Sequence, residues 1–204
     1  MAIAARSTRD PGALNGFGSK NETRIGGIAR TSRRLHFHSD AAMTTLSSAL
    51  PPIRIVPLAD AFLARVRAGA DDQGQLVERH IAQGGEPLRD CLRRALPGEA
   101  ILLTSYCPFT IAGPYKEYGP VFVSASPQPA PRLDTLPFDG EQPYLGASFV
   151  LRAYSADERI VDATLSSTSS AAPDLNTFLA RDDVAFVLAR FAAYGCYALR
   201  IERR

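Results

Sequence analysis

The alternation of hydrophobic and polar positions is clearest in the last third of the chain. It predicts two β-hairpins, whose strands are 148–154 with 159–165, and 184–191 with 196–202. β-Rich runs joined by a short polar or glycine-containing segment are typical of hairpins, and Gly195 can adopt the positive φ that a tight turn requires. Between the hairpins, Pro173 predicts the first position of a short helix that continues through Leu175 and Phe178.

Shorter patterns occur in the middle of the chain. Residues 59–69 place Phe62 and Val66 at helical spacing, and Gly69 is a typical helix-ending residue. Runs of β-prone residues predict strands over 53–58, 100–106 and 121–123. A further segment suits a strand or a helix equally well, namely 75–82. Proline-containing segments predict surface loops over 107–118 and 126–147.

Strands outnumber helices in this pattern, and tight hairpins join them. The regular alternation of strands and long helices that a βαβ array requires does not occur in the pattern. The sequence therefore predicts one α+β domain over 43–204, built on a mostly antiparallel sheet with two or three short helices.

Residues 1–42 lack hydrophobic periodicity and carry seven basic side chains against three acidic ones. Such a segment buries too little apolar surface to offset the entropy of ordering, so we expect a disordered tail. Two arginines within the first ten residues interrupt any apolar core of a secretory signal. Met43 lies where this composition ends, and our hypothesis is that it is the biological start. His36 and His38 have no acid or thiol nearby at metal-binding spacing.

The composition is that of a globular protein, with 46% hydrophobic residues, 22% charged residues and a formal net charge of +2. No apolar run approaches the roughly 18 residues of a membrane-spanning helix, so no membrane contact is expected. Residues 43–204 carry 16 basic and 18 acidic groups, a balance that offers no electrostatic footprint for nucleic acid. Three scattered cysteines predict neither a disulfide framework nor a zinc site, and favour the reducing cytoplasm. No glycine-rich phosphate motif occurs, so no cofactor is expected.

Several segments resemble a known family. They include Tyr-x-x-x-Gly-Pro-x-Phe-Val over 115–123, Leu-Arg-Ala-Tyr over 151–154 and Gly-Cys-Tyr-Ala over 195–198. Together with Asp-Cys-Leu over 90–92, these segments resemble the bacterial family catalogued as domain of unknown function 1203, across residues 53–203. The resemblance implies a bacterial source and leaves the first residues outside the domain. It names no reaction, ligand or partner.

A thiol is one candidate for chemistry. A catalytic cysteine needs a base within reach, and His80 lies eleven residues before Cys91 in the sequence. The two side chains can meet if they lie on neighbouring strands around the Gly84-Gly85 break. The alternative is a small buried thiol that only packs. An exposed Cys91 of low pKa would favour a thiol-dependent enzyme or a redox-responsive protein, whereas a buried neutral thiol would favour a binding module.

Two charged residues fall on strand faces that hairpin register predicts to be apolar. A four-residue turn over 192–195 pairs Arg190 with Tyr197. The same face would carry Phe186, Leu188, Leu199 and Ile201. A turn over 155–158 pairs Leu151 with Asp162, and that face would also carry Phe149, Ala153 and Ile160. A charge in such surroundings reaches solvent, forms an ion pair or binds a ligand.

The ligand alternative is a pocket for a small anion. Its candidate residues are Arg190 or Arg152, with Tyr115, Tyr154 and Asp162. No complete catalytic set can be assembled from the sequence, so the composition and motifs favour a small-molecule-binding or accessory module. The alternative function is thiol-dependent or redox-responsive chemistry at Cys91.

Overall fold

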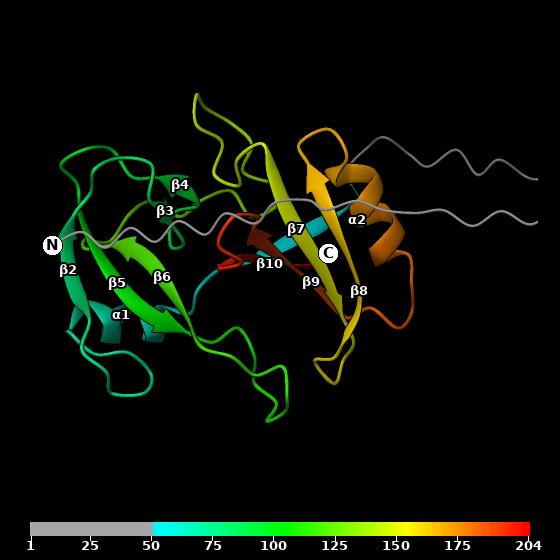
Figure 1. Ribbon diagram of the computed structural model, residues 1–204, viewed down its shortest axis with the longest axis horizontal. Coiled ribbons are helices and arrows are strands. Elements are labelled where there is room, and N and C mark those ends of the chain that lie inside the picture. The colour runs from blue at the N-terminus through cyan, green and yellow to red at the C-terminus, as the bar shows by residue number, and fades with distance from the viewer. Residues whose placement is uncertain (1–50) are drawn as a thin grey trace, which may run out of the picture. The chain divides into compact units, whose positions relative to one another are not determined.

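The computed structural model describes residues 51–204, which form two five-stranded β-sheets and two α-helices (Figure 1). The first sheet is antiparallel throughout. Its strands, in spatial order, are β1 (Ile53–Val56), β10 (Tyr197–Arg203), β9 (Phe186–Phe191), β7 (Ser148–Tyr154) and β8 (Ile160–Ser167). The predicted α+β class is thereby confirmed. The predictions of a disordered tail over 1–42 and of a start at Met43 lie outside the described residues.

The second sheet contains one parallel pair. Its strands, in spatial order, are β2 (Glu78–Ile81), β5 (Ala100–Tyr106), β6 (Gly119–Ser124), β3 (Pro87–Leu88) and β4 (Arg93–Arg94). Leu88 of β3 pairs in parallel with Phe122 of β6, and the other neighbouring strands are antiparallel. The strands β3 and β4 have only two residues each and leave no periodic signal in the sequence. The ambiguous segment 75–82 contains a strand, β2.

Both helices are short. The helix α1 (Asp60–Arg67) buries Phe62 and Val66, as its periodicity predicts. The helix α2 (Ala171–Leu179) begins two residues before Pro173, so the prediction of proline at the first helical position is wrong. Proline is tolerated there because the first-turn N–H groups have no intrahelical acceptor. Neither helix of the described residues is long and apolar enough to span a membrane.

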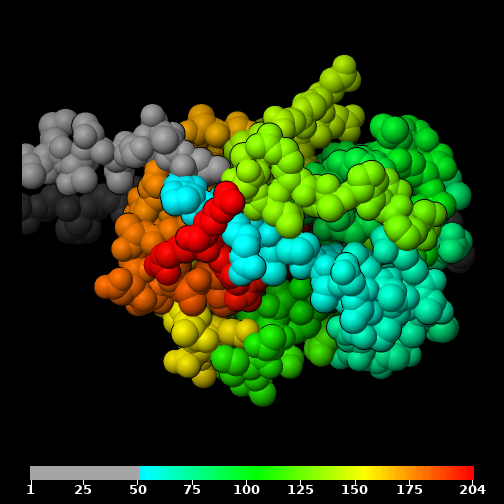
Figure 2. All heavy atoms as spheres, turned by 180° about the vertical axis from the view of Figure 1, so that it is seen from behind, coloured from blue at the N-terminus to red at the C-terminus, as the bar shows by residue number. Residues whose placement is uncertain are grey.

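The first sheet is buried on both faces. One face packs against α2 and part of the 126–147 connection, in a cluster that includes Phe149, Leu151 and Leu175. The opposite face packs against α1 and the second sheet. As a result, all six residues of β9 are buried. The 126–147 connection itself runs along the molecular surface (Figure 2, yellow-green).

The β9–β10 hairpin has the predicted turn but not the predicted register. Arg190 pairs with Tyr197 as expected, but a bulge at Ala198 then places Leu199 opposite Ala189. The predicted common face of Arg190 with Leu199 and Ile201 is therefore wrong. Leu199 and Ile201 face the α2 side of the sheet, because a bulge adds one residue and reverses the alternation beyond it.

The β7–β8 hairpin also contains a bulge. Asp162 pairs with Ala153, not with Leu151, and Tyr154 pairs with Ile160, which leaves Val161 as the extra residue. The shift by two positions keeps Asp162 on the face of Leu151 and Ala153. The prediction that Ile160 shares that face is wrong, because Ile160 packs in the cluster on the opposite side.

Candidate anion-binding site

A cavity of about 950 Å³ opens where several loops meet the second sheet. It is bounded by residues 83–87, by the turn after β9 and by the segment 145–148. Its apolar walls are formed by Leu103, Phe122, Leu145 and Phe191. The volume falls in the range that small-molecule sites occupy, which is about 300–1,000 Å³.

Arg89 lies in the wall of this cavity, immediately after β3, and is only 4% exposed. Its Nε donates to the carbonyl oxygen of Tyr197 at 3.0 Å, and its Nη1 donates to that of Pro87 at 2.6 Å. Its Cζ lies 5.0 Å from the ring centroid of Phe191. Burial is the main cause that lowers the pKa of Arg89, and the positive charge of Arg94 acts in the same direction.

Arg94 approaches the same ring from β4. Its Cζ lies 5.1 Å from the Phe191 centroid, and its Nη1 donates to the carbonyl oxygen of Gly85 at 2.8 Å. The guanidinium is half-buried, and burial lowers its pKa. Gly146 passes close by, because a Cβ placed on that residue would lie 3.8 Å from Nη2 of Arg94.

Neither arginine has an acidic partner in the described part of the chain. Ten ion pairs occur among residues 51–204, and none of them includes Arg89 or Arg94. Glu86 lines the cavity, but its carboxylate accepts the backbone N–H groups of Gln83 and Gly84 at 2.8 and 3.0 Å. Two neighbouring cations, one of them buried, therefore share the cavity wall with only carbonyl dipoles and an aromatic ring as partners. Such an arrangement is costly without an anion.

Arg190 and Asp162 do not form the ion pair that was one of the predicted outcomes. Arg190 is 5% exposed, and its Nη2 bonds to the carboxylate of Glu117 in the 107–118 loop. Asp162 lies on the edge strand β8, where its carboxylate accepts from Nη1 of Arg181 at 2.8 Å. Glu117 and Arg181 are both remote in sequence, so register alone could not identify these partners.

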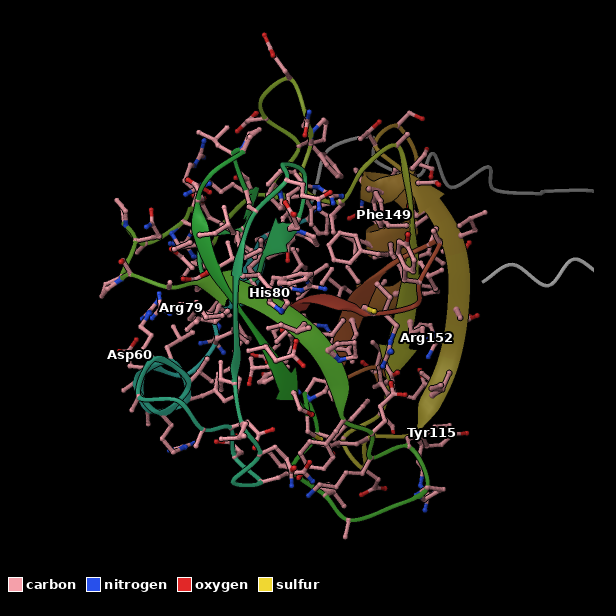
Figure 3. The ribbon with its side chains drawn as sticks, turned by 60° about the vertical axis from the view of Figure 1, so that its left-hand side comes forward. Asp60, Arg79, His80, Tyr115, Phe149 and Arg152 are labelled. Atoms are coloured by element: carbon pink, nitrogen blue, oxygen red, sulfur yellow. The ribbon has the colours of Figure 1, made fainter. Side chains whose placement is uncertain are left out.

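The remaining predicted ligand residues do not converge on one cavity. Tyr154 is 1% exposed and stacks on Phe186 with a centroid separation of 5.1 Å, so it is a core residue. Tyr115 lines a separate cavity of about 300 Å³, and its ring lies 5.9 Å from Cζ of Arg159. Arg152 is half-buried on β7, and Figure 3 shows it on the side of that strand that faces the second sheet.

Cys91 and His80 lie in different parts of the second sheet. Cys91 belongs to the turn between β3 and β4, whereas His80 lies on β2 at the opposite edge of the sheet, beyond β5 and β6. The condition for the two side chains to meet, a position on neighbouring strands around the Gly84-Gly85 break, is therefore not met. Burial, and then the carboxylate of Asp90, raise the pKa of the Cys91 thiol to about 12. Within residues 51–204, no group of three or more His, Cys, Asp or Glu side chains is placed to hold a metal ion.

Comparison with known proteins assigns the chain to a protein family. Residues 85–203 match the family model described as "Protein of unknown function (DUF1203)". Because this match spans more than half of the chain, the protein belongs to that family, as the sequence resemblance predicts. The matched segment includes both Arg89 and Arg94 and the turn beyond Phe191. No curated protein and no solved structure matches the chain.

Proposed function

We propose that this protein binds a small organic anion in the cavity of about 950 Å³, with the anionic group held by Arg89 and Arg94. The observation that carries the proposal is the pair of guanidinium groups, one buried, that lack a carboxylate partner among the described residues. Guanidinium groups present a planar fork of N–H donors that matches carboxylate and phosphate. An anion between them would supply the missing counter-charge.

The walls of the cavity indicate what the rest of the ligand is. Leu103 and Phe122 pair across β5 and β6 and both line the cavity, and Leu145 and Phe191 extend the apolar surface. A bare inorganic ion would leave this surface in contact with water. The apolar lining therefore favours a carboxylate or phosphate that carries a hydrocarbon or aromatic body.

The alternative function, thiol chemistry at Cys91, lacks comparable support. A thiol with a pKa of about 12 is overwhelmingly protonated at neutral pH, and the thiolate is the reactive form. His80 bonds instead to the carboxylate of Glu78 at 2.9 Å. The geometry thus favours a binding module over a thiol-dependent enzyme.

The test compares three probes of the same length, namely hexanoate, its neutral isostere hexanamide and the diacid hexanedioate. A ligand that binds only the folded state raises the melting temperature. We expect hexanoate at about 10 mM, a concentration suited to a Kd in the millimolar range, to stabilise the wild-type protein more than hexanamide does. The Arg94→Met variant should lose this difference.

Arg79→Met is the matched control, because it removes the same charge from an exposed position on β2 that does not line the cavity (Figure 3). It should retain the response to hexanoate. Equal stabilisation of wild type and Arg94→Met, or equal effects of hexanoate and hexanamide on the wild type, would contradict the proposed function.

A further inference from the structure

Arg190 is a second buried arginine, and its hydrogen bonding is incomplete. Its Nη1 donates to the carbonyl oxygen of Gly195 at 3.0 Å, and its Nη2 bonds to Glu117. Its Nε is buried and has no hydrogen-bond partner among the described residues. A buried donor without an acceptor destabilises the protein. The guanidinium therefore has capacity for a further acceptor.

The partner of Arg190 is a surface residue. The side chain of Glu117 is 51% exposed, compared with 6% for that of Arg190. Glu117 lies in the irregular 107–118 loop, and its carboxylate has no second partner among the described residues. Another anion can replace an exposed carboxylate on a loop at little cost, because the displaced group becomes fully hydrated.

The space beside Arg190 adjoins the larger cavity. A smaller cavity of about 180 Å³ is lined by Arg190 and Glu117, and it shares Pro120, Tyr194 and Cys196 with the larger one. Arg89 and Arg190 also donate hydrogen bonds to the same short stretch of chain. Arg89 donates to the carbonyl oxygen of Tyr197, and Arg190 donates to that of Gly195. Carbonyls two residues apart are separated by at most about 7 Å, so the bonded guanidinium nitrogens lie within about 13 Å of each other.

We propose that the ligand carries two anionic groups, one bound by Arg89 and Arg94 and the other bound by Arg190 in place of Glu117. This inference rests on the proposed function and narrows its ligand class to dianions with an apolar spacer. Glu117 then occupies the second anion subsite in the unliganded protein. The ligand's second group, which displaces it, can accept from the unpartnered Nε as well.

The experiment measures the ratio of the affinities for hexanedioate and hexanoate. In the wild type, hexanedioate must compete with Glu117, so the ratio is moderate. The Glu117→Gln variant removes the competing charge, and we expect the ratio to rise roughly tenfold, the equivalent of about 1.4 kcal/mol. The Arg190→Gln variant should bring the ratio close to one. Glu78→Gln is the matched control, because Glu78 is exposed on β2, lines neither cavity and pairs only with His80.

Failure of this inference is distinguishable from failure of the proposed function. If hexanoate binds in an Arg94-dependent manner but Glu117→Gln and Glu78→Gln give the same ratio, the second subsite is refuted and the first stands. If neither probe shows Arg94-dependent binding, both proposals are refuted. Because Glu117 is on the surface, its variant is expected to fold and so keeps the test decisive even if Arg190→Gln is unstable.

Discussion

If Arg94 exists to bind a ligand, its removal should leave the unliganded protein nearly as stable as before. We therefore single out Arg94→Met, which replaces the guanidinium with an unbranched apolar side chain of similar reach. The prediction is a change of no more than about 1 kcal/mol in the free energy of unfolding, together with loss of the response to hexanoate.

The small change follows from opposing contributions. The substitution removes the hydrogen bond that the charged guanidinium donates to Gly85, worth about 1.5–3 kcal/mol, and a cation–π contact with Phe191 worth about 0.5–1 kcal/mol. Part of the second loss is recovered, because a methionine sulfur against an aromatic ring contributes about 0.3–1.5 kcal/mol. The substitution also relieves repulsion between the arginines. Because both Cζ atoms lie near 5 Å from one ring centroid, they are at most about 10 Å apart, and the repulsion is at least about 0.4–1.7 kcal/mol for dielectric constants between about 80 and 20.

Arg89→Met is the contrasting variant. Arg89 is almost fully buried and donates to the carbonyl oxygens of Tyr197 and Pro87. Its removal leaves two acceptors in a poorly hydrated position, at about 1–3 kcal/mol each. We expect this variant to be less stable than the wild type by about 2–4 kcal/mol, even though the repulsion with Arg94 is relieved.

Urea denaturation without ligand measures both variants on the same scale, and an unchanged slope establishes that the denatured states are comparable. A loss above about 2 kcal/mol for Arg94→Met, outside the range of surface substitutions, would show that Arg94 is a structural residue. Equal effects of the Arg89 and Arg94 substitutions would also refute the reasoning, because the calculation depends on the difference in their backbone contacts.

Three further predictions concern other parts of the fold. Burial acts to raise the pKa of Glu158, but hydrogen bonds from Thr110 and Ile111 outweigh this effect and lower the pKa. The ionised Glu158 therefore stabilises the folded protein above the unfolded-state pKa of about 4.3, and this stabilisation is lost as the pH falls through the lower folded-state pKa. Urea titrations should show that the stability of Glu158→Gln depends less on acid than that of the wild type. Gly195→Val should reduce stability by about 1–3 kcal/mol, because the residue has φ +69°, and an unchanged urea midpoint would contradict this. Burial raises the pKa of the Cys91 thiol to about 12. Iodoacetamide near pH 8 should therefore label Cys91 at least about a hundredfold more slowly in the folded than in the unfolded protein, as measured by mass spectrometry after brief treatment. Equal labelling rates would contradict the raised pKa.

The elements that depend on local pattern could be predicted from the sequence. The hairpin turns, the helix α1 and the strand β5 all occur where periodicity and turn residues indicate them. Strand register could be predicted correctly only at the pair Arg190–Tyr197 of the β9–β10 hairpin, because bulges at Ala198 and Val161 are invisible to an alternation pattern. Each bulge reverses the faces of the residues beyond it, which moved Ile201 and Ile160 to the opposite sides from those expected.

The residues of the candidate site could also be predicted from the sequence only in part. Arg190 could be identified from the sequence because it interrupts an apolar strand, although its partner Glu117 could not. Arg89 and Arg94 occur in a polar stretch where charges are unremarkable. Arg89 directly follows β3 and Arg94 lies on β4, and these strands have only two residues each. Their burial results from pairing between distant segments, with Leu88 against Phe122 and both guanidiniums against Phe191.

The charge of the whole body bears on the type of anion that these arginines can select. Residues 43–204 carry 16 basic and 18 acidic groups. This balance provides no overall positive charge that would add to the positive potential of the cavity. At physiological ionic strength, screening by salt limits the distance over which an isolated positive charge acts to about 8–10 Å. A polyanion such as nucleic acid gains affinity from many separate phosphate contacts, which a balance of 16 basic and 18 acidic groups does not favour. On the proposed function, a small anion would need only the two or three guanidinium groups in the cavity walls, and its apolar body would contact the ring of Phe122. Local geometry and not net charge would then determine which anion binds.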